Sequence, residues 1–229
     1  MEQGENLGML LAVNTGKPVP VMHGRQEVQT GIFKKTVAGP VRITVNGLPG
    51  DGQADPVNHG GPDKAVCVYT QSHWRHWERV WGESPAFGAF GENFTITDGV
   101  EQDVGIGDII RVGGAVVQVS QPRLPCFKLG LRHGKPELPG MVLETGYTGY
   151  YFRVLEEGDV REGDTLIRIM RQPVRLSVYE AVRIMKFERT SLEAAERLQA
   201  APGLAEGWKE ELGIRIEKLR SGAEGGEPL

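Results

Sequence analysis

The chain has 229 residues, of which 39% are hydrophobic and 24% are charged, which is the composition of a folded globular protein rather than a disordered one. The formal charge of −4 argues against a nucleic-acid groove, because phosphate backbones require a concentrated cationic surface. The N-terminal segment carries acidic residues where a signal peptide carries positive charge, and no apolar run approaches the roughly 20 residues that span a membrane. We therefore expect a cytoplasmic protein that binds neither a nucleic-acid polymer nor a membrane.

From residue 7 to residue 170 the sequence predicts short β-strands separated by glycine. The candidate strands are rich in β-branched residues; they are LGMLLAVN at 7–14, VRITVNGL at 41–48, AVCVYT at 65–70, GDIIRVGGAVVQVS at 107–120 and GDTLIRIM at 163–170. The pair Gly113-Gly114 divides the fourth of them into the two strands of a tight hairpin, because such a turn needs positive φ. Many short strands joined in this way favour a barrel or a closed, curved sheet.

One helix is expected inside this β-rich part. Trp74, Trp77 and Trp81 recur at helical spacing in QSHWRHWERVWG, and the run ends at Gly82. We expect this amphipathic helix to pack on the barrel.

The pattern changes after residue 171, where three short helices are expected. Ser177 with Glu180, and Thr190 with Glu193, match the capping box that starts a helix by satisfying unpaired backbone N–H groups. A third apolar face follows at helical spacing. The expected domains are a mainly β barrel over residues 1–171 that carries the site, a three-helix domain over 172–221 and a disordered tail over 222–229.

Cys126 lies in SQPRLPCFKLG, directly after a predicted strand and between the basic residues Arg123 and Lys128. Pro122 and Pro125 end the strand and stiffen the loop. A thiol fixed beside two cations is in the electropositive setting that favours thiolate, the form that acts as a nucleophile or a soft-metal ligand. On the residues alone, a small buried side chain remains the alternative interpretation, since free cysteines are often buried.

Cys67, the second cysteine, has the opposite setting. It lies between Val66 and Val68 in a predicted central strand, so we expect a core side chain. Two cysteines are too few for a disulfide framework.

Glycine loops with basic or hydroxyl side chains are candidates for binding an anion. In the segment 58–64, two glycines let backbone N–H groups approach an anion, while His59 and Lys64 add donors or charge. The segments 30–35 and 148–153 add hydroxyls, amines and a guanidinium. On these residues alone, ordinary turns are the commoner interpretation.

Five motifs in a fixed order carry a resemblance to a known family. They are TGIFK at 30–34, GDGQAD at 50–55, NHGGPDKAV at 58–66, AFGENF at 89–94 and SQPRLPCFKLG at 120–130. The chain resembles the YiiM-like proteins of the MOSC family over most of residues 7–170, and the tail is similar to the helical domain of that family. The resemblance implies a MOSC-type β-barrel with a few packed helices, followed by a small C-terminal three-helix domain.

The activity that the resemblance implies is that of a molybdenum-cofactor-dependent oxidoreductase. Its barrel would hold a molybdopterin, and Cys126 occupies the position of the catalytic thiolate that ligates molybdenum. The substrate would be a small N-hydroxylated compound such as 6-hydroxylaminopurine, reduced to the amine. A separate flavin or iron–sulfur reductase would donate electrons, because the chain shows no flavin, nicotinamide or ferredoxin-like motif of its own.

Further residues in these motifs are candidates for contacting the cofactor phosphate and pterin, because they combine anion donors with glycine loops. They are Thr30, Lys34, His59, Gly60, Gly61, Asn93, Arg123, Thr148, Gly149 and Arg153. Two alternatives stay open, namely a sulfur carrier that holds a persulfide on Cys126 and a non-enzymatic pterin-binding protein.

Overall fold

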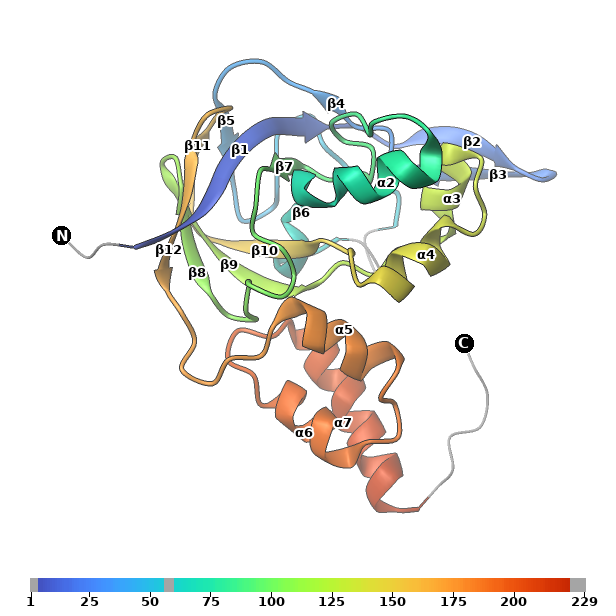
Figure 1. Ribbon diagram of the computed structural model, residues 1–229, viewed down its shortest axis with the longest axis vertical. Coiled ribbons are helices and arrows are strands. Elements are labelled where there is room, and N and C mark those ends of the chain that lie inside the picture. The colour runs from blue at the N-terminus through green and yellow to red at the C-terminus, as the bar shows by residue number, and fades with distance from the viewer. Residues whose placement is uncertain (1–3, 56–59, 223–229) are drawn as a thin grey trace.

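The protein is described by a computed structural model over residues 4–55 and 60–222, in which seven strands close into a barrel (Figure 1). The barrel strands are β1 (Glu5–Thr15), β6 (Val66–Thr70), β7 (Phe94–Ile96), β8 (Ile109–Val112), β9 (Ala115–Pro122), β10 (Tyr150–Glu156) and β12 (Thr165–Met170). They are hydrogen-bonded in the order β12-β8-β9-β10-β6-β7-β1, and antiparallel pairing of β1 with β12 closes the ring. The mainly β fold expected from the sequence is confirmed.

Shorter strands lie outside the closed ring of the barrel. They are β2 (Val19–His23), β3 (Gln26–Thr30), β4 (Lys35–Thr36), β5 (Val41–Ile43) and β11 (Gly158–Val160). Strands β2 and β3 form a hairpin that projects from the barrel (Figure 1), and β5 pairs with β11. The segment predicted as a strand at 41–48 therefore supplies only β5 and stays outside the ring.

Strands β6 and β7 are parallel neighbours, so a tight hairpin cannot join them. Their crossover contains the 3₁₀ turn η2 (Gln71–His73) and helix α2 (Trp74–Trp81), where the tryptophan spacing predicted a helix. Trp77 is fully buried, and Gly82 ends the helix with φ of 80°.

Helices α3 (Phe127–His133) and α4 (Leu138–Thr145) lie beside α2. Leu129, Leu138 and Val142 form a small apolar cluster with Trp77 of α2, separate from the barrel core. This cluster fixes α3, and with it the loop that leads from β9 into α3.

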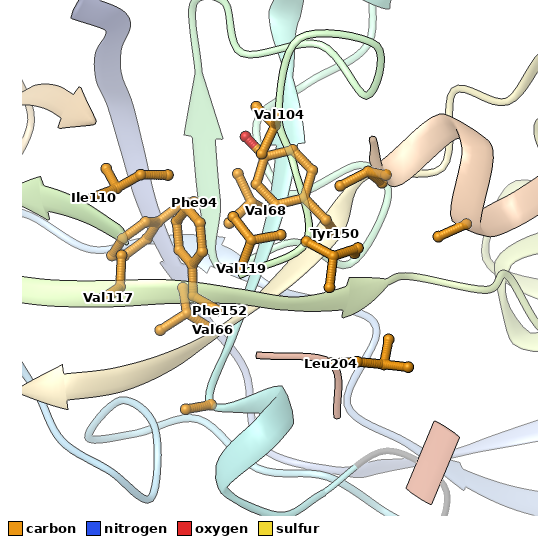
Figure 2. Packing of buried hydrophobic residues seen from close by; sticks show 14 of the residues in the cluster. Val66, Val68, Phe94, Val104, Ile110, Val117, Val119, Tyr150, Phe152 and Leu204 are labelled. Atoms are coloured by element: carbon orange, nitrogen blue, oxygen red, sulfur yellow. The ribbon is translucent and has the colours of Figure 1, made fainter. Parts of the chain in front are cut away.

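Helices α5 (Val178–Lys186), α6 (Leu192–Gln199) and α7 (Glu206–Arg220) follow the barrel and pack at one end of it (Figure 1). Figure 2 shows barrel side chains such as Val68, Val119 and Tyr150 packed together, with Leu204 from the segment before α7 nearby. Barrel and helices share this continuous core, so the division into two domains at residue 171 stays a prediction. Residues 223–229 of the predicted tail lie outside the described residues.

Among the helices that the structure describes, each is too short or too polar to cross a membrane.

The start of α6 corrects one prediction. The capping box of α5 is present: Ser177 Oγ accepts a hydrogen bond from Glu180 N at 3.1 Å, and Glu180 Oε2 accepts one from Ser177 N at 2.9 Å. Helix α6 is capped by Ser191, whose hydroxyl accepts from Ala194 N, so the predicted box at Thr190 is wrong. Ser191 has the extended backbone that an N-cap requires, and Thr190 stands one residue too early.

These two caps give a matched stability test. Ser177→Ala and Ser191→Ala should each lower the free energy of unfolding by about 1 kcal/mol, because each leaves a helix N–H unpaired. Thr190→Ala, at an exposed residue without a capping role, should change it by less than about 0.5 kcal/mol. Urea unfolding measures all three variants, and a loss at Thr190 as large as that at Ser191 would contradict the observed cap.

Candidate active site

A cavity opens where the β9–α3 loop meets several other segments of the chain, and it brings together residues that are far apart in sequence. Of the residues predicted to form the site, the ones in its wall are Thr30, Lys34, Asn93, Arg123 and Cys126. These come from β3, the segment before β4, the residue before β7 and the β9–α3 loop. The separate motifs of the sequence therefore converge on one place.

Cys126 stands at the N-cap position of α3, after the extended segment that leaves β9. Its carbonyl oxygen accepts a hydrogen bond from Leu129 N at 3.0 Å, so the backbone of the residue is fixed by the first turn of the helix. The residue is half-buried and its thiol is unpaired with another cysteine. A fixed thiol in a cavity wall can act as a ligand or a nucleophile.

Arg123 is a buried cation in the cavity wall and is only 7% exposed. Its backbone N donates to Gly149 O at 3.0 Å, and its Nη2 donates to Phe90 O at 2.7 Å. Its Nη1 is buried, and within the described part of the chain no acceptor pairs with it. Such a donor is costly to leave unpaired, so the guanidinium is suited to an anionic ligand in the cavity.

Lys34, the second predicted anion donor, already has a partner. Its Nζ forms a buried ion pair with Asp51 Oδ1, and Asp51 also accepts from Asn93 Nδ2 at 2.9 Å and from Gly16 N at 2.9 Å. The carboxylate thus balances the charge of Lys34. Sequence analysis did not assign Asp51, although it lies in the motif GDGQAD, because the pairing spans 17 residues of chain.

Asn93 is in the cavity wall as expected, but its hydrogen bonds are structural. Its Oδ1 accepts from Cys67 N at 3.0 Å, and its Nδ2 also donates to Asn14 O at 3.1 Å. Through these bonds Asn93 ties β6 to β1 and holds Asp51 beside Lys34.

Cys67 is buried in β6, as predicted, yet its side chain lines the same cavity as Cys126. The alternation of a strand explains this, since Val66 and Val68 point into the barrel core and Cys67 points the other way. Burial raises the pKa of Cys67 to about 11. Its thiol is therefore protonated at neutral pH. A metal ligand is a thiolate, so Cys67 is not in the form that binds a metal.

The described cavity wall does not include Thr148, Gly149 or Arg153. Gly149 has φ of +72°, and a Cβ there would lie 2.3 Å from Val68 O, so glycine allows the loop to approach β6. Its carbonyl oxygen holds the backbone of Arg123, so the residue supports the site indirectly.

Arg153 serves the fold through an ion pair of 2.6 Å with Asp63, and its Nη1 donates to Gln118 at 3.0 Å. Gly60 and Gly61 line a second cavity, which shares Lys64, Leu124 and Tyr151 with the first. The predicted residue His59 lies outside the described residues.

Within residues 4–55 and 60–222, no group of three or more His, Cys, Asp or Glu side chains is placed to hold a metal ion.

Comparison with known proteins identifies the family of the chain. The model of the MOSC domain matches residues 55–167, and the chain is 44% identical over 200 residues to the protein YflK of Bacillus subtilis (strain 168), covering 87% of this chain and 90% of YflK. The chain belongs to the MOSC family. The crystal structure of YiiM from Geobacillus stearothermophilus matches this MOSC protein with a TM-score of 0.78 and 36% identity, covering 91% of this chain and 98% of that one.

A longer relative carries a functional name. A protein of Gibberella moniliformis (strain M3125 / FGSC 7600) named "Reductase" is 33% identical to this MOSC chain over 216 residues. The match covers 85% of this chain but only 38% of the fungal protein, so this MOSC chain corresponds to one part of it.

The unpaired Nη1 of Arg123 predicts anion binding by the cofactor-free MOSC protein. Arg123→Gln should weaken the binding of inorganic phosphate by roughly tenfold or more, because a charge-assisted hydrogen bond is lost. Arg111→Gln, at an exposed residue of β8 outside both cavities, is the matched control and should bind phosphate as the parent does. Titration calorimetry measures the affinities, and equal phosphate binding by Arg123→Gln and the parent would show that the guanidinium is not the anion site.

Proposed function

We propose that this MOSC protein is a molybdenum-cofactor-dependent oxidoreductase that reduces small N-hydroxylated substrates, such as 6-hydroxylaminopurine, to the amine. The observation that carries the proposal is the juxtaposition of a half-buried thiol, Cys126, with the buried and unpaired guanidinium donor of Arg123 in one cavity. Molybdopterin requires both features, since its metal binds soft thiolate sulfur and its phosphate requires a cationic donor.

The cavity residues fit this cofactor in charge as well. The ion pair of Lys34 with Asp51 leaves no net charge at that wall, whereas Arg123 and Lys128 add cationic side chains. An anionic group bound beside Arg123 would satisfy its Nη1. Cys126 would be the protein ligand of molybdenum, and the remaining sulfur ligands would belong to the cofactor itself.

When bound, the cofactor supplies the two-electron chemistry that removes the oxygen of an N–OH group. The balanced change adds two electrons and two protons to the hydroxylamine and releases the amine and water. Cys126 and Arg123 would hold the cofactor in one orientation. Burial raises the pKa of Tyr151, which lines both cavities, so its hydroxyl keeps its proton at neutral pH and can donate a hydrogen bond.

The two cysteines have different roles in this proposal. Since the pKa of Cys67 is raised to about 11, it would remain a neutral wall of the cavity while Cys126 ligates the metal. Electrons would come from a separate flavin or iron–sulfur reductase. The name of the fungal relative supports a reductive activity.

The test is molybdenum content and N-reduction after expression in a host that makes the cofactor. The parent should contain near-stoichiometric molybdenum, and Cys126→Ala should lose the metal and the activity while keeping the thermal midpoint of the cofactor-free parent, because a half-buried thiol contributes little packing. Phe127→Ala is the control, since the side chain of Phe127 is 47% exposed, adjoins Cys126 in sequence and is not in the cavity wall. It should retain metal and rate.

Each other outcome has a defined meaning. Full metal and full rate in Cys126→Ala would contradict the proposed ligand. Sulfane sulfur on Cys126 without molybdenum would favour the sulfur carrier, and neither metal nor sulfane sulfur would favour a pterin-binding protein without redox activity.

A further inference from the structure

The second cavity is formed by the barrel on one side and by the beginning of α7 on the other, and it has a volume of about 460 Å³. It is not separate from the first, because Lys64, Leu124 and Tyr151 line both. A molecule in the second cavity would therefore lie next to the cavity that contains Cys126. Its volume is in the range of small-molecule sites.

The walls of this cavity combine aromatic rings with hydrogen-bond donors and acceptors. Tyr151 and Trp208 are the aromatic residues, and Trp208 is only 7% exposed. Gln121 is 5% exposed, and its Nε2 donates a long hydrogen bond of 3.4 Å to the carbonyl oxygen of Pro122. Glu211 adds a carboxylate from the same face of α7 as Trp208. Such walls suit a flat, nitrogen-rich ring whose edge carries both donors and acceptors.

The position of α7 against the barrel is fixed at the cavity itself. Asp63 Oδ2 accepts a hydrogen bond from Glu206 N at 3.0 Å, and Asp63 is paired with Arg153. Ser120 O accepts from Ala205 N at 2.9 Å, and Ser120 Oγ donates to Asp63 O at 2.5 Å. The ion pair of Arg153 with Asp63 thus links β10 to the beginning of α7, on either side of the cavity.

We infer that the second cavity binds the heteroaromatic ring of the substrate, with Gln121, Trp208 and Glu211 as specificity-determining residues. The N-hydroxy group is then directed at the shared wall formed by Leu124 and Tyr151. The part of this inference that concerns the reaction rests on the proposed function, whereas the binding of the ring does not. Helix α7 would then contribute to the selection of the substrate.

Gly207 allows a test that blocks the cavity with little disturbance of the fold. The residue lines the cavity, its φ is not positive, and a Cβ built on it meets no heavy atom within 4 Å. Gly207→Leu should therefore keep the helix. Gly140→Leu is the matched control, since Gly140 is a helical glycine with the same open surroundings and lies outside both cavities.

The probe is adenine, the amine product of a hydroxylaminopurine, titrated by calorimetry into cofactor-free protein. Gly207→Leu should weaken adenine binding roughly tenfold and raise KM for 6-hydroxylaminopurine in the loaded enzyme by a similar factor, with molybdenum content unchanged. Gly140→Leu should match the parent in all three measurements. If Gly207→Leu fails to fold, Glu211→Gln, compared with the exposed neighbour variant Glu210→Gln, should show the same selective loss of adenine affinity.

Two results would overturn the inference. One is loss of molybdenum from Gly207→Leu with adenine binding intact, which would assign the cavity to the cofactor. The other is adenine affinity that is equal in the parent and in both cavity variants. Absence of metal in the parent, with adenine binding that Gly207→Leu still weakens, would contradict the proposed function and support the ring-binding cavity.

Discussion

The buried guanidinium of Arg123 is the constraint around which the site is built, because a cation that is only 7% exposed requires partners on every side. The fold supplies some of them. Gly149 O accepts from its backbone, and Gly149 N in turn donates to the fully buried Glu101 at 2.6 Å. Glu101 pairs with His73 at 2.7 Å, and Phe90 O accepts from Nη2. Within the described part of the chain the fold leaves Nη1 unpaired, and an anionic ligand in the cavity would pair with it.

A second buried acid, Glu92, positions the carbonyl of Phe90, which accepts a hydrogen bond from the guanidinium of Arg123. Glu92 accepts from Gly88 N at 2.7 Å, from Phe90 N at 2.9 Å and from Thr95 Oγ1 at 2.8 Å, and burial raises its pKa. The turn that carries the carbonyl of Phe90 is thereby held rigid. The motif AFGENF is thus a support for Arg123, so preorganisation of the site begins outside the residues that would touch the ligand.

Local pattern was enough to predict the β-rich fold, helix α2, the Gly113-Gly114 hairpin and the position of Cys126 after a strand. Interactions across long stretches of chain were not predictable from it. The pairing of Lys34 with Asp51 depends on where two loops meet. Position in sequence likewise could not show that Cys67 turns its thiol toward the cavity of Cys126, because both faces of a fully buried strand carry apolar residues.

The central claim is that Cys126 is the protein ligand of molybdenum in a site completed by Arg123, and X-ray absorption at the molybdenum edge tests it most directly. The account predicts that the metal-loaded parent has one more sulfur ligand than Cys126→Ser reconstituted with an excess of the same cofactor, since the serine side chain has no sulfur to donate. An identical sulfur shell in the parent and in Cys126→Ser would contradict the account, because the thiol would then lie beside the metal without binding it.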